Sequence, residues 1–466
     1  MTETNRQARR DRDSGEPPNV LWVFIDDVCP WMSCYGHDVV ETEHVDALAE
    51  RGARFDRAYA TAPVCTPSRS AIVTGLYQTS IGAHNHYSSF GTWRGLEIDR
   101  WDPNHLDVRT VPETFRSAGY YTFNEGKNHY NFVDRDEQLY DRKGDENAFQ
   151  GATDGTEWSG RAEGQPFFGQ IQLRGGKVEV DDDIERVDPA AVEVPPYYPD
   201  HPVYRDEIAH HYDTIQQMDR TLGEVLEALR RDGLYENTVV CFLADHGMRL
   251  PRHKQFCYEG GIRIPLVFAG PGVPAGVERD DLVSGIDVGP TSLALAGIDV
   301  PDHVHGGDVF AEDFHREFVV AARDRCDYTR DRIRAVVTDR YKYIRNYMTD
   351  RPYLQPQYRD GREYMTVLKR LHEAGALDET QSRFVSDERP AEELYDLRAD
   401  PHETENLVHS DDREHATALG RLRETLARWT VETGDEGGEP ESDAALAAVV
   451  QRWGDEAVDD VYDRVR

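Results

Sequence analysis

The residues best suited to chemistry in this chain form a short run at positions 65–69, with the sequence Cys-Thr-Pro-Ser-Arg. Thr66 can cap a helix, Pro67 suits a first helical position and Gly75 suits a helix end, so we predict a short helix after the cysteine. The Cys65 thiol would then face free backbone N–H groups at the positive end of the helix dipole. That environment suits a nucleophile and a bound anion. A buried structural cysteine is the alternative interpretation.

Acidic residues follow two continuous apolar runs that lie far apart in the sequence, residues 20–25 and 238–244. Such runs are typical of buried parallel strands, and the sites of open α/β sheets lie at the carboxyl ends of their strands. The two runs end at Asp26-Asp27 and Asp245-His246. Carboxylates gathered at one place repel unless a cation neutralises them, and Ca²⁺ or Mg²⁺ suits oxygen ligands. The histidine nitrogen keeps Mn²⁺ open, and each pair alone could simply cap a turn.

Lysine is rare in this chain, since only six of the 53 basic residues are lysines. Two of the six, Lys127 and Lys254, stand in short polar segments that also contain histidines, among them His129. An anionic ester needs fixed cationic donors as its bond breaks, so these residues are candidates for binding such a substrate. His86 lies in the loop after the cysteine helix and could line the same pocket. Solvated surface positions are the alternative for all four.

Together these motifs resemble the signature of the type I sulfatases, a formylglycine-dependent family with the alkaline-phosphatase-like fold. The resemblance extends over roughly residues 19–410 and includes the segments at 258–266 and 393–407. Residues 194–200, with the long helix that follows them, resemble the heparan N-sulfatase (sulfamidase) branch most closely.

The resemblance implies a role for each candidate residue. Cys65 would be converted to formylglycine, whose hydrated aldehyde attacks sulfur while Arg69 orients it. Lys127 and Lys254 would bind the sulfate, and His129 would take the proton from the remaining hydroxyl as sulfate is expelled. The metal, Ca²⁺ or alternatively Mg²⁺ or Mn²⁺, would be held by Asp26, Asp27, residue 65, Asp245 and His246.

One position departs from the pattern of the resembled family. Most sulfatases carry a histidine after the strand that corresponds to residues 167–173, and this histidine helps to protonate the leaving group. Here the segment continues with Arg174, Gly175 and Gly176. Arginine can bind an anion but cannot donate a proton near neutral pH. We therefore expect Arg174 to contact substrate, as His86 could from its own loop. Protonation would fall to Lys254 or to a histidine of another loop, or the leaving group is acidic enough to need little help.

Composition restricts the class of partner and the cellular setting. The net charge of −35, from 53 basic and 88 acidic residues, argues against duplex nucleic acid as a partner. An acidic, lysine-poor chain that is still 38% hydrophobic indicates a folded protein adapted to high salt. The six cysteines form no disulfide-like framework, and no segment has the pattern of a signal peptide or a membrane span. We expect a cytoplasmic protein.

The order of the predicted elements indicates two structural units. Strands alternate with helices over residues 19–314, which predicts an α/β domain with a doubly wound, mainly parallel sheet. Residues 315–432 have the pattern of a small antiparallel α+β subdomain, with a hairpin around residues 338–340. We expect residues 1–18 to be a disordered leader and residues 433–466 to be an acidic tail.

These observations predict a sulfatase that hydrolyses a sulfate monoester or a sulfamate. Its partners would be a small-molecule or carbohydrate sulfate ester and a formylglycine-generating enzyme that modifies Cys65. A phosphate or phosphonate ester hydrolase with the same fold is an alternative, because both substrates present tetrahedral oxyanions to a cationic pocket. A non-catalytic anion-binding relative with an unmodified Cys65 is the other.

Overall fold

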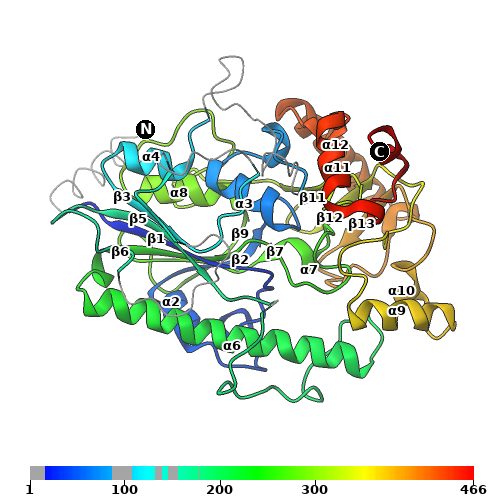
Figure 1. Cartoon of the computed structure of the whole chain (residues 1–466), viewed down its shortest axis with the longest axis horizontal. Helices are drawn as coiled ribbons and strands as arrows, with labels where there is room; N and C mark the ends of the chain where they lie inside the picture. The colour runs from blue at the N-terminus through cyan, green and yellow to red at the C-terminus, as the bar shows by residue number, and fades with distance from the viewer. Residues whose placement is uncertain (1–15, 87–107, 132–138, 145–155, 177) are drawn as a thin grey trace.

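The computed structural model describes residues 16–86, 108–131, 139–144, 156–176 and 178–466, so most of the predicted leader lies outside the described residues. Two sheets organise the described part of the chain (Figure 1). The larger sheet comprises β1 (Asn19–Ile25), β2 (Gly52–Tyr59), β3 (Tyr121–Glu125), β4 (Arg142–Lys143), β5 (Phe167–Leu173), β6 (Thr238–Ala244), β7 (Arg263–Ile264), β8 (Leu266–Ala269) and β9 (Val277–Ser284).

The central strands of the larger sheet are parallel, as the sequence predicts. The strand order is β4-β3-β5-β1-β6-β8-β2-β7, and β9 pairs with β2. Strand β1 lies between β5 and β6 and is parallel to both. Strand β8 is antiparallel to both β6 and β2, so the sheet is mixed at that side. Every residue of β1, β5 and β6 is buried, because helices cover both faces of the sheet.

Helices lie on both sides of the larger sheet (Figure 1). One side carries α2 (Glu43–Arg51) and α6 (Pro202–Arg231), and the other carries α3 (Cys65–Thr74), α4 (Val111–Ser117) and α8 (Val288–Leu295). Helix α6 has an apolar stripe that includes Ile208, Ile215 and Leu222, all fully buried. It begins at Pro202 because the His201 side chain caps it and a proline suits the first turn.

The second sheet is antiparallel and has the order β10-β11-β12-β13. Its strands are β10 (Val319–Arg323), β11 (Ile333–Val337), β12 (Tyr341–Asn346) and β13 (Glu392–Asp396). The predicted hairpin joins β11 to β12, and Thr338 and Tyr341 close its turn with hydrogen bonds. Helix α11 (Arg413–Glu432) packs Leu422 and Trp429 into one cluster with this sheet. Between β12 and β13 the chain forms α9 (Glu363–Glu373) and α10 (Glu379–Arg383).

The segment 433–466 differs from the acidic tail that we expected. It forms helix α12 (Asp443–Trp453) and short 3-10 turns, and it packs against Tyr328. Leu446 and Val449 are buried there, and the Tyr462 hydroxyl donates a hydrogen bond to the Tyr328 carbonyl at 3.0 Å. The acidic composition masks an apolar helical stripe, which is enough to dock a short helix. Within the described ranges no helix is long and apolar enough to cross a membrane.

Candidate active site

The register of the central strands brings the two acidic pairs to one edge of the sheet. Ile25 at the end of β1 lies opposite Ala244 at the end of β6, so the residues that follow both strands emerge together. The backbone N–H of Asp27 donates to Asp245 Oδ1 at 3.2 Å, and that of Val28 donates to the His246 carbonyl at 3.1 Å. Asp27 has a left-handed backbone (φ 58°), a strained conformation of the kind that clusters at functional sites.

Two glycines support this edge from the end of β5. A Cβ atom on Gly175 would lie 1.9 Å from the Asp26 carbonyl oxygen, and one on Gly176 would lie 2.4 Å from that of Asp27. The N–H of Gly176 donates to the Asp26 carbonyl at 3.0 Å. Only glycine lets the backbone approach so closely, so the Gly-Gly pair holds the acidic pair in place.

Helix α3 presents Cys65 to the acidic residues, although it does not begin as predicted. Cys65 is its first residue, and the N-cap Val64 has an extended backbone with no side-chain cap. The predicted Thr66 cap is therefore wrong: its hydroxyl instead lies 2.7 Å from His86 Nδ1. Pro67 is the third helical residue rather than the first. Gly75 ends the helix in the left-handed conformation, as predicted (φ 69°).

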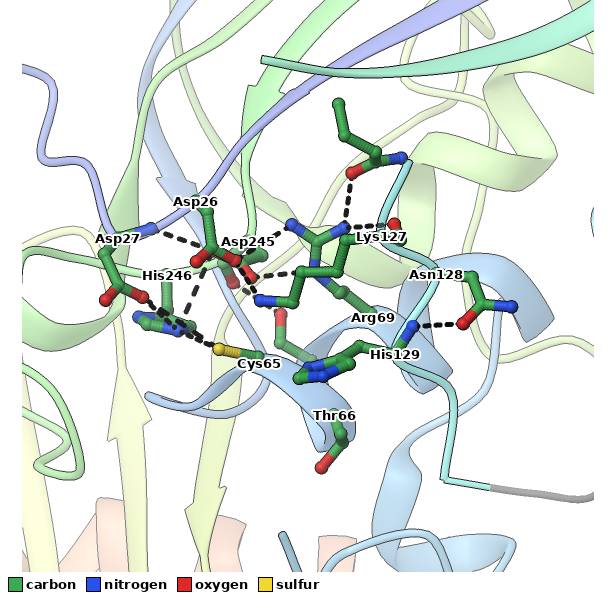
Figure 2. Close-up of polar contacts among 12 residues, drawn as sticks. Asp26, Asp27, Cys65, Thr66, Arg69, Lys127, Asn128, His129, Asp245 and His246 are labelled. Atoms are coloured by element: carbon green, nitrogen blue, oxygen red, sulfur yellow. Dashed lines mark hydrogen bonds and ion pairs between the residues drawn. The ribbon is translucent and has the colours of Figure 1, made fainter. Parts of the chain in front are cut away.

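The side chains at this edge form two groups with the ligand types of a metal site (Figure 2). Asp27, Cys65 and His246 make up one group, and Asp26, Cys65 and Asp245 the other; within each group the candidate ligand atoms lie within 4.8 Å of one another. All five residues are buried. Burial and the charge of Asp26 raise the pKa of Asp245 to about 6. Crowded, buried carboxylates of this kind fit a divalent cation bound mainly through oxygen.

Three buried cations contact the same carboxylates, and Figure 2 shows two of them, Arg69 and Lys127. Arg69 donates to Asp245 Oδ2 at 2.8 Å and to Asp26 Oδ1 at 3.1 Å. Lys127 donates to Asp26, and Lys254 donates to both Asp27 oxygens at 2.8 and 3.0 Å. Lys254 Nζ is also 3.6 Å from the Cys65 sulfur. It would therefore lie next to an anion attached at position 65.

The remaining predicted residues lie in different surroundings. His129 has a left-handed backbone (φ 53°), and its ring centre is 6.4 Å from that of buried His86. Burial, with the charges of His129 and Lys254, lowers the pKa of His86 well below its usual value. Arg174 is different, because it forms an ion pair with Asp181 at 3.0 Å and is partly exposed. Within the described part of the chain its contacts do not include the other site residues, so the structure does not bring it to them.

Sequence reasoning missed other residues that line the site. Gln172 accepts a hydrogen bond from Arg69 Nη1 at 2.6 Å and thereby holds the guanidinium. Cys326 and Asp327 form a third buried group with His86, again with ligand atoms within 4.8 Å of one another. No motif marks Cys326 and Asp327 in the sequence, because they reach the site from the loop after β10. The position of Gln172 near the end of a buried strand was the only available signal.

This arrangement can attack and hold a tetrahedral oxyanion. A nucleophile at position 65 would lie beside a candidate cation site and next to Lys254. Arg69 and Lys127 contact the carboxylates of that cation site. Such preorganised positive charge stabilises negative charge as it develops on a sulfuryl group.

Comparisons with known proteins identify the family. The model of the family described as Sulfatase matches residues 18–187 and 164–298, and that described as N-sulphoglucosamine sulphohydrolase, C-terminal, matches residues 246–373. An ulvan-active sulfatase of Formosa agariphila is 32% identical over 92% of this chain and 77% of its own length. Human N-sulphoglucosamine sulphohydrolase is 26% identical over 90% of this chain and 91% of its own.

The fold agrees with a solved structure, that of BT4656 in complex with its substrate D-glucosamine-2-N,6-O-disulfate. The TM-score is 0.64 at 19% identity, over 91% of this chain and 99% of the other. This likeness confirms the predicted alkaline-phosphatase-like architecture. The family match covers more than half of the chain, and the homologues include a sulfamidase. The chain therefore belongs to the sulfatase family and is a sulfuric ester hydrolase.

Proposed function

We propose that this sulfatase removes sulfate from a carbohydrate, with Cys65 converted to formylglycine and a divalent cation beside it. The observation that carries the proposal is the position of Cys65, whose sulfur lies 3.2 Å from His246 Nε2 and 3.9 Å from Asp27 Oδ1. The carbohydrate part is supported by the names of the relatives, which include an ulvan-active sulfatase and a structure with a disulfated glucosamine.

The proposed cation is Ca²⁺, held by Asp26, Asp27, Asp245 and His246 together with residue 65. Hard oxygen donors favour Ca²⁺ or Mg²⁺, and the histidine nitrogen leaves Mn²⁺ as an alternative. When bound, the ion supplies Lewis acidity that shields the charge of the sulfate oxygens.

The residues around position 65 divide the remaining tasks. Formylglycine supplies a hydrated aldehyde, whose hydroxyl is the nucleophile. Arg69 orients that group, because Asp26, Asp245 and Gln172 fix its guanidinium. Lys127 and Lys254 bind the sulfate oxygens, and His129 accepts a proton when sulfate leaves.

The mass of the peptide that contains Cys65 tests the nucleophile. Coexpression with a formylglycine-generating enzyme is expected to lower that mass by about 18 Da, as conversion of a thiol to an aldehyde requires. An unmodified thiol in an active preparation would contradict the proposal. Cys65→Ser serves as the control, since a site that recognises cysteine leaves serine unchanged.

A panel of sulfated sugars, aryl sulfates, sulfamates and matched aryl phosphates tests the substrate class. We expect sulfated sugars to be hydrolysed with the highest kcat/KM. The acidic, lysine-poor composition supports assays in high salt. Preferential hydrolysis of the phosphates would favour the alternative ester class. The cytoplasmic location stays a prediction.

A further inference from the structure

The loop after β10 places a third cluster of buried groups beside the proposed nucleophile. His86, Cys326 and Asp327 have side-chain atoms within 4.8 Å of one another. His86 also lies 2.7 Å from the hydroxyl of Thr66, the residue next to Cys65. The pKa of Asp327 responds to the charges of Lys254 and Cys65, so its carboxyl lies within electrostatic range of both. The roles proposed above leave this cluster unused.

Asp327 is buried without an ion pair. It is 4% exposed, and among the described residues no Lys, Arg or His nitrogen lies within the 4.0 Å of an ion pair with its carboxyl. The side-chain hydrogen bond that reaches this carboxyl comes from the Cys326 thiol at 3.7 Å. The guanidinium of Arg325 donates to the Asp327 backbone carbonyl but is paired with Glu441. A buried carboxyl without a cationic partner is stabilised in its protonated form.

A second acid in the same loop has the opposite surroundings. Asp331 is also buried, but it pairs with Arg323 at 2.7 Å and with Arg389 at 2.8 Å. Although burial opposes them, these two charges lower the pKa of Asp331. Burial raises the pKa of Asp327 to about 6, against the opposing charges of Arg325 and Lys254. When the pKa values of two carboxyls in one loop are shifted in opposite directions, the carboxyl with the raised pKa is suited to donate a proton.

The backbone fixes the Asp327 side chain in this position. Asp327 has a left-handed backbone (φ 52°), which is costly for a residue with a Cβ atom. Hydrogen bonds in both directions between Cys326 and Thr329 close the turn, and Arg325 is held by its ion pair with Glu441 of the C-terminal segment. The chain thus maintains a strained conformation that holds the Asp327 carboxyl beside His86 and Cys326.

We propose that Asp327 is the general acid that protonates the leaving group. As the nucleophile at position 65 adds to sulfur, the bond from sulfur to the leaving oxygen breaks and its electron pair stays on that oxygen. The proton of the Asp327 carboxyl moves to the same oxygen, which departs as an alcohol. The carboxylate recovers a proton from water after the product leaves.

The other candidate donors at the site are less suitable. The Lys254 ammonium donates to the Asp27 carboxylate and lies beside residue 65, where it is placed to bind the sulfate. His86 is neutral because burial lowers its pKa, so it can orient the Asp327 carboxyl but holds no extra proton. Arg174 is turned toward Asp181. The proposal therefore fills the role left open by the missing histidine after β5.

The test compares leaving groups on the full chain with modified Cys65. We expect Asp327→Asn to lower kcat/KM for phenyl sulfate by about 100-fold or more, because a poor leaving group needs the proton. For 4-nitrophenyl sulfate, whose phenolate leaves unaided, the loss should stay within about 3-fold. Asp324→Asn is the matched control in the same loop: it removes a buried acid that pairs with Arg334 and should leave the ratio of the two substrates unchanged.

An equal loss with both substrates, or no loss with either, would overturn the role of Asp327. If Asp327→Asn does not fold, the wild-type pH profile decides. The protonated carboxyl is the active form, so kcat/KM for phenyl sulfate should fall as the pH rises through about 6, while that for 4-nitrophenyl sulfate should not. Parallel profiles would refute the proposal. Infrared difference spectra should also show a protonated carboxyl at pH 5 that Asp327→Asn lacks.

This inference rests on the sulfatase chemistry proposed above but not on the carbohydrate substrate. The aryl sulfates alone test Asp327. Failure of every sulfated sugar, with the aryl series behaving as expected, would refute the carbohydrate proposal and leave the role of Asp327 standing.

Discussion

Buried charges occur in two regions of this molecule, and they are satisfied differently in each. In the second sheet, Arg334 on β11 is fully buried and pairs with Asp435 at 2.7 Å and with Asp324 at 3.1 Å. Lys342 on β12 is fully buried between two glutamates, at 2.8 Å from each. At the edge of the larger sheet, three carboxylates crowd around Cys65, and burial raises the pKa of Asp245 to about 6.

The difference shows that buried charged side chains contribute to stability in the second sheet and to chemistry at the edge of the larger sheet. Arg334 joins β11 to Asp324 after β10 and to Asp435 of the C-terminal segment, and Lys342 joins β12 to Glu259 and Glu403. The carboxylates of the site are crowded, and the cation proposed above would balance their charge. Removing the buried Arg334 of the second sheet should therefore cost more stability than removing one of the crowded carboxylates of the site.

The largest effect is expected for Arg334→Met. This change leaves two buried carboxylates without their partner, and it should lower the free energy of unfolding by about 3–5 kcal/mol. Urea unfolding measures this loss. Arg398→Met is the matched control, since Arg398 forms an exposed pair with Asp339 and should cost less than about 1 kcal/mol. Similar losses for both variants would contradict the comparison.

Binding of Ca²⁺ should have the next largest effect. An ion that binds only the folded state stabilises it by about 2.7 kcal/mol at a concentration one hundred times its Kd. Thermal unfolding with and without a chelator measures the change. Asp27→Asn should abolish this response to Ca²⁺. Its metal-free Tm should lie below that of the wild type, because buried Lys254 loses its carboxylate partner, so the comparison is between the shifts that Ca²⁺ causes in the two proteins. A chelator that leaves the wild-type Tm unchanged would argue against a cation at this site.

Acid should weaken the second sheet. The pKa of Asp331 lies below its usual 3.8 in the folded protein because, although burial opposes them, Arg323 and Arg389 favour the carboxylate. The stabilisation is therefore fully present above that usual value and is lost as the pH falls through the lower folded value. Denaturant midpoints measured from pH 6 downward should drop most steeply below about pH 4. Asp331→Asn should flatten that drop.

The smallest effect on stability is expected for Asp245→Asn. Replacing this carboxylate by an isosteric amide removes its repulsion with Asp26, and Arg69 keeps its ion pair with Asp26. The metal-free free energy of unfolding should therefore fall by less than it does for Arg334→Met. Turnover should nevertheless be lost. A loss of stability as large as that of Arg334→Met would show that the site charges are structural.

Much of the fold followed from local patterns. The continuous apolar runs of β1, β5 and β6 indicate buried parallel strands, and the stripe of α6 indicates a helix packed on the sheet. Strands β2 and β9 escaped notice because charged residues interrupt them, as in Arg54 and Asp56 of β2. Helix α12 escaped notice because acidic residues precede and follow it and dominate the composition of the segment.

The residues of the candidate site also fall into two classes, those that a local sequence pattern predicts and those that it does not. Cys65, Arg69 and the acidic pairs lie in recognisable motifs, and each motif carries its own local geometry. Asp327 and Gln172 carry no such signal. The prediction that Thr66 caps the helix was wrong for a similar reason: its hydroxyl lies within hydrogen-bond distance of His86, which comes from another loop.

The sequence by itself determined the family, the parallel sheet and the residues that the resemblance marks for catalysis, because those features depend on residue type, spacing and periodicity. Only the tertiary structure decided that Asp327 lies with His86 and Cys326 and, among the described residues, has no ion pair. It also decided that Arg174 pairs with Asp181 and that the C-terminal segment anchors Arg325. The physical reason is that the charge state of a buried side chain depends on neighbours far away in the chain, and those neighbours come together only when the sheets pack.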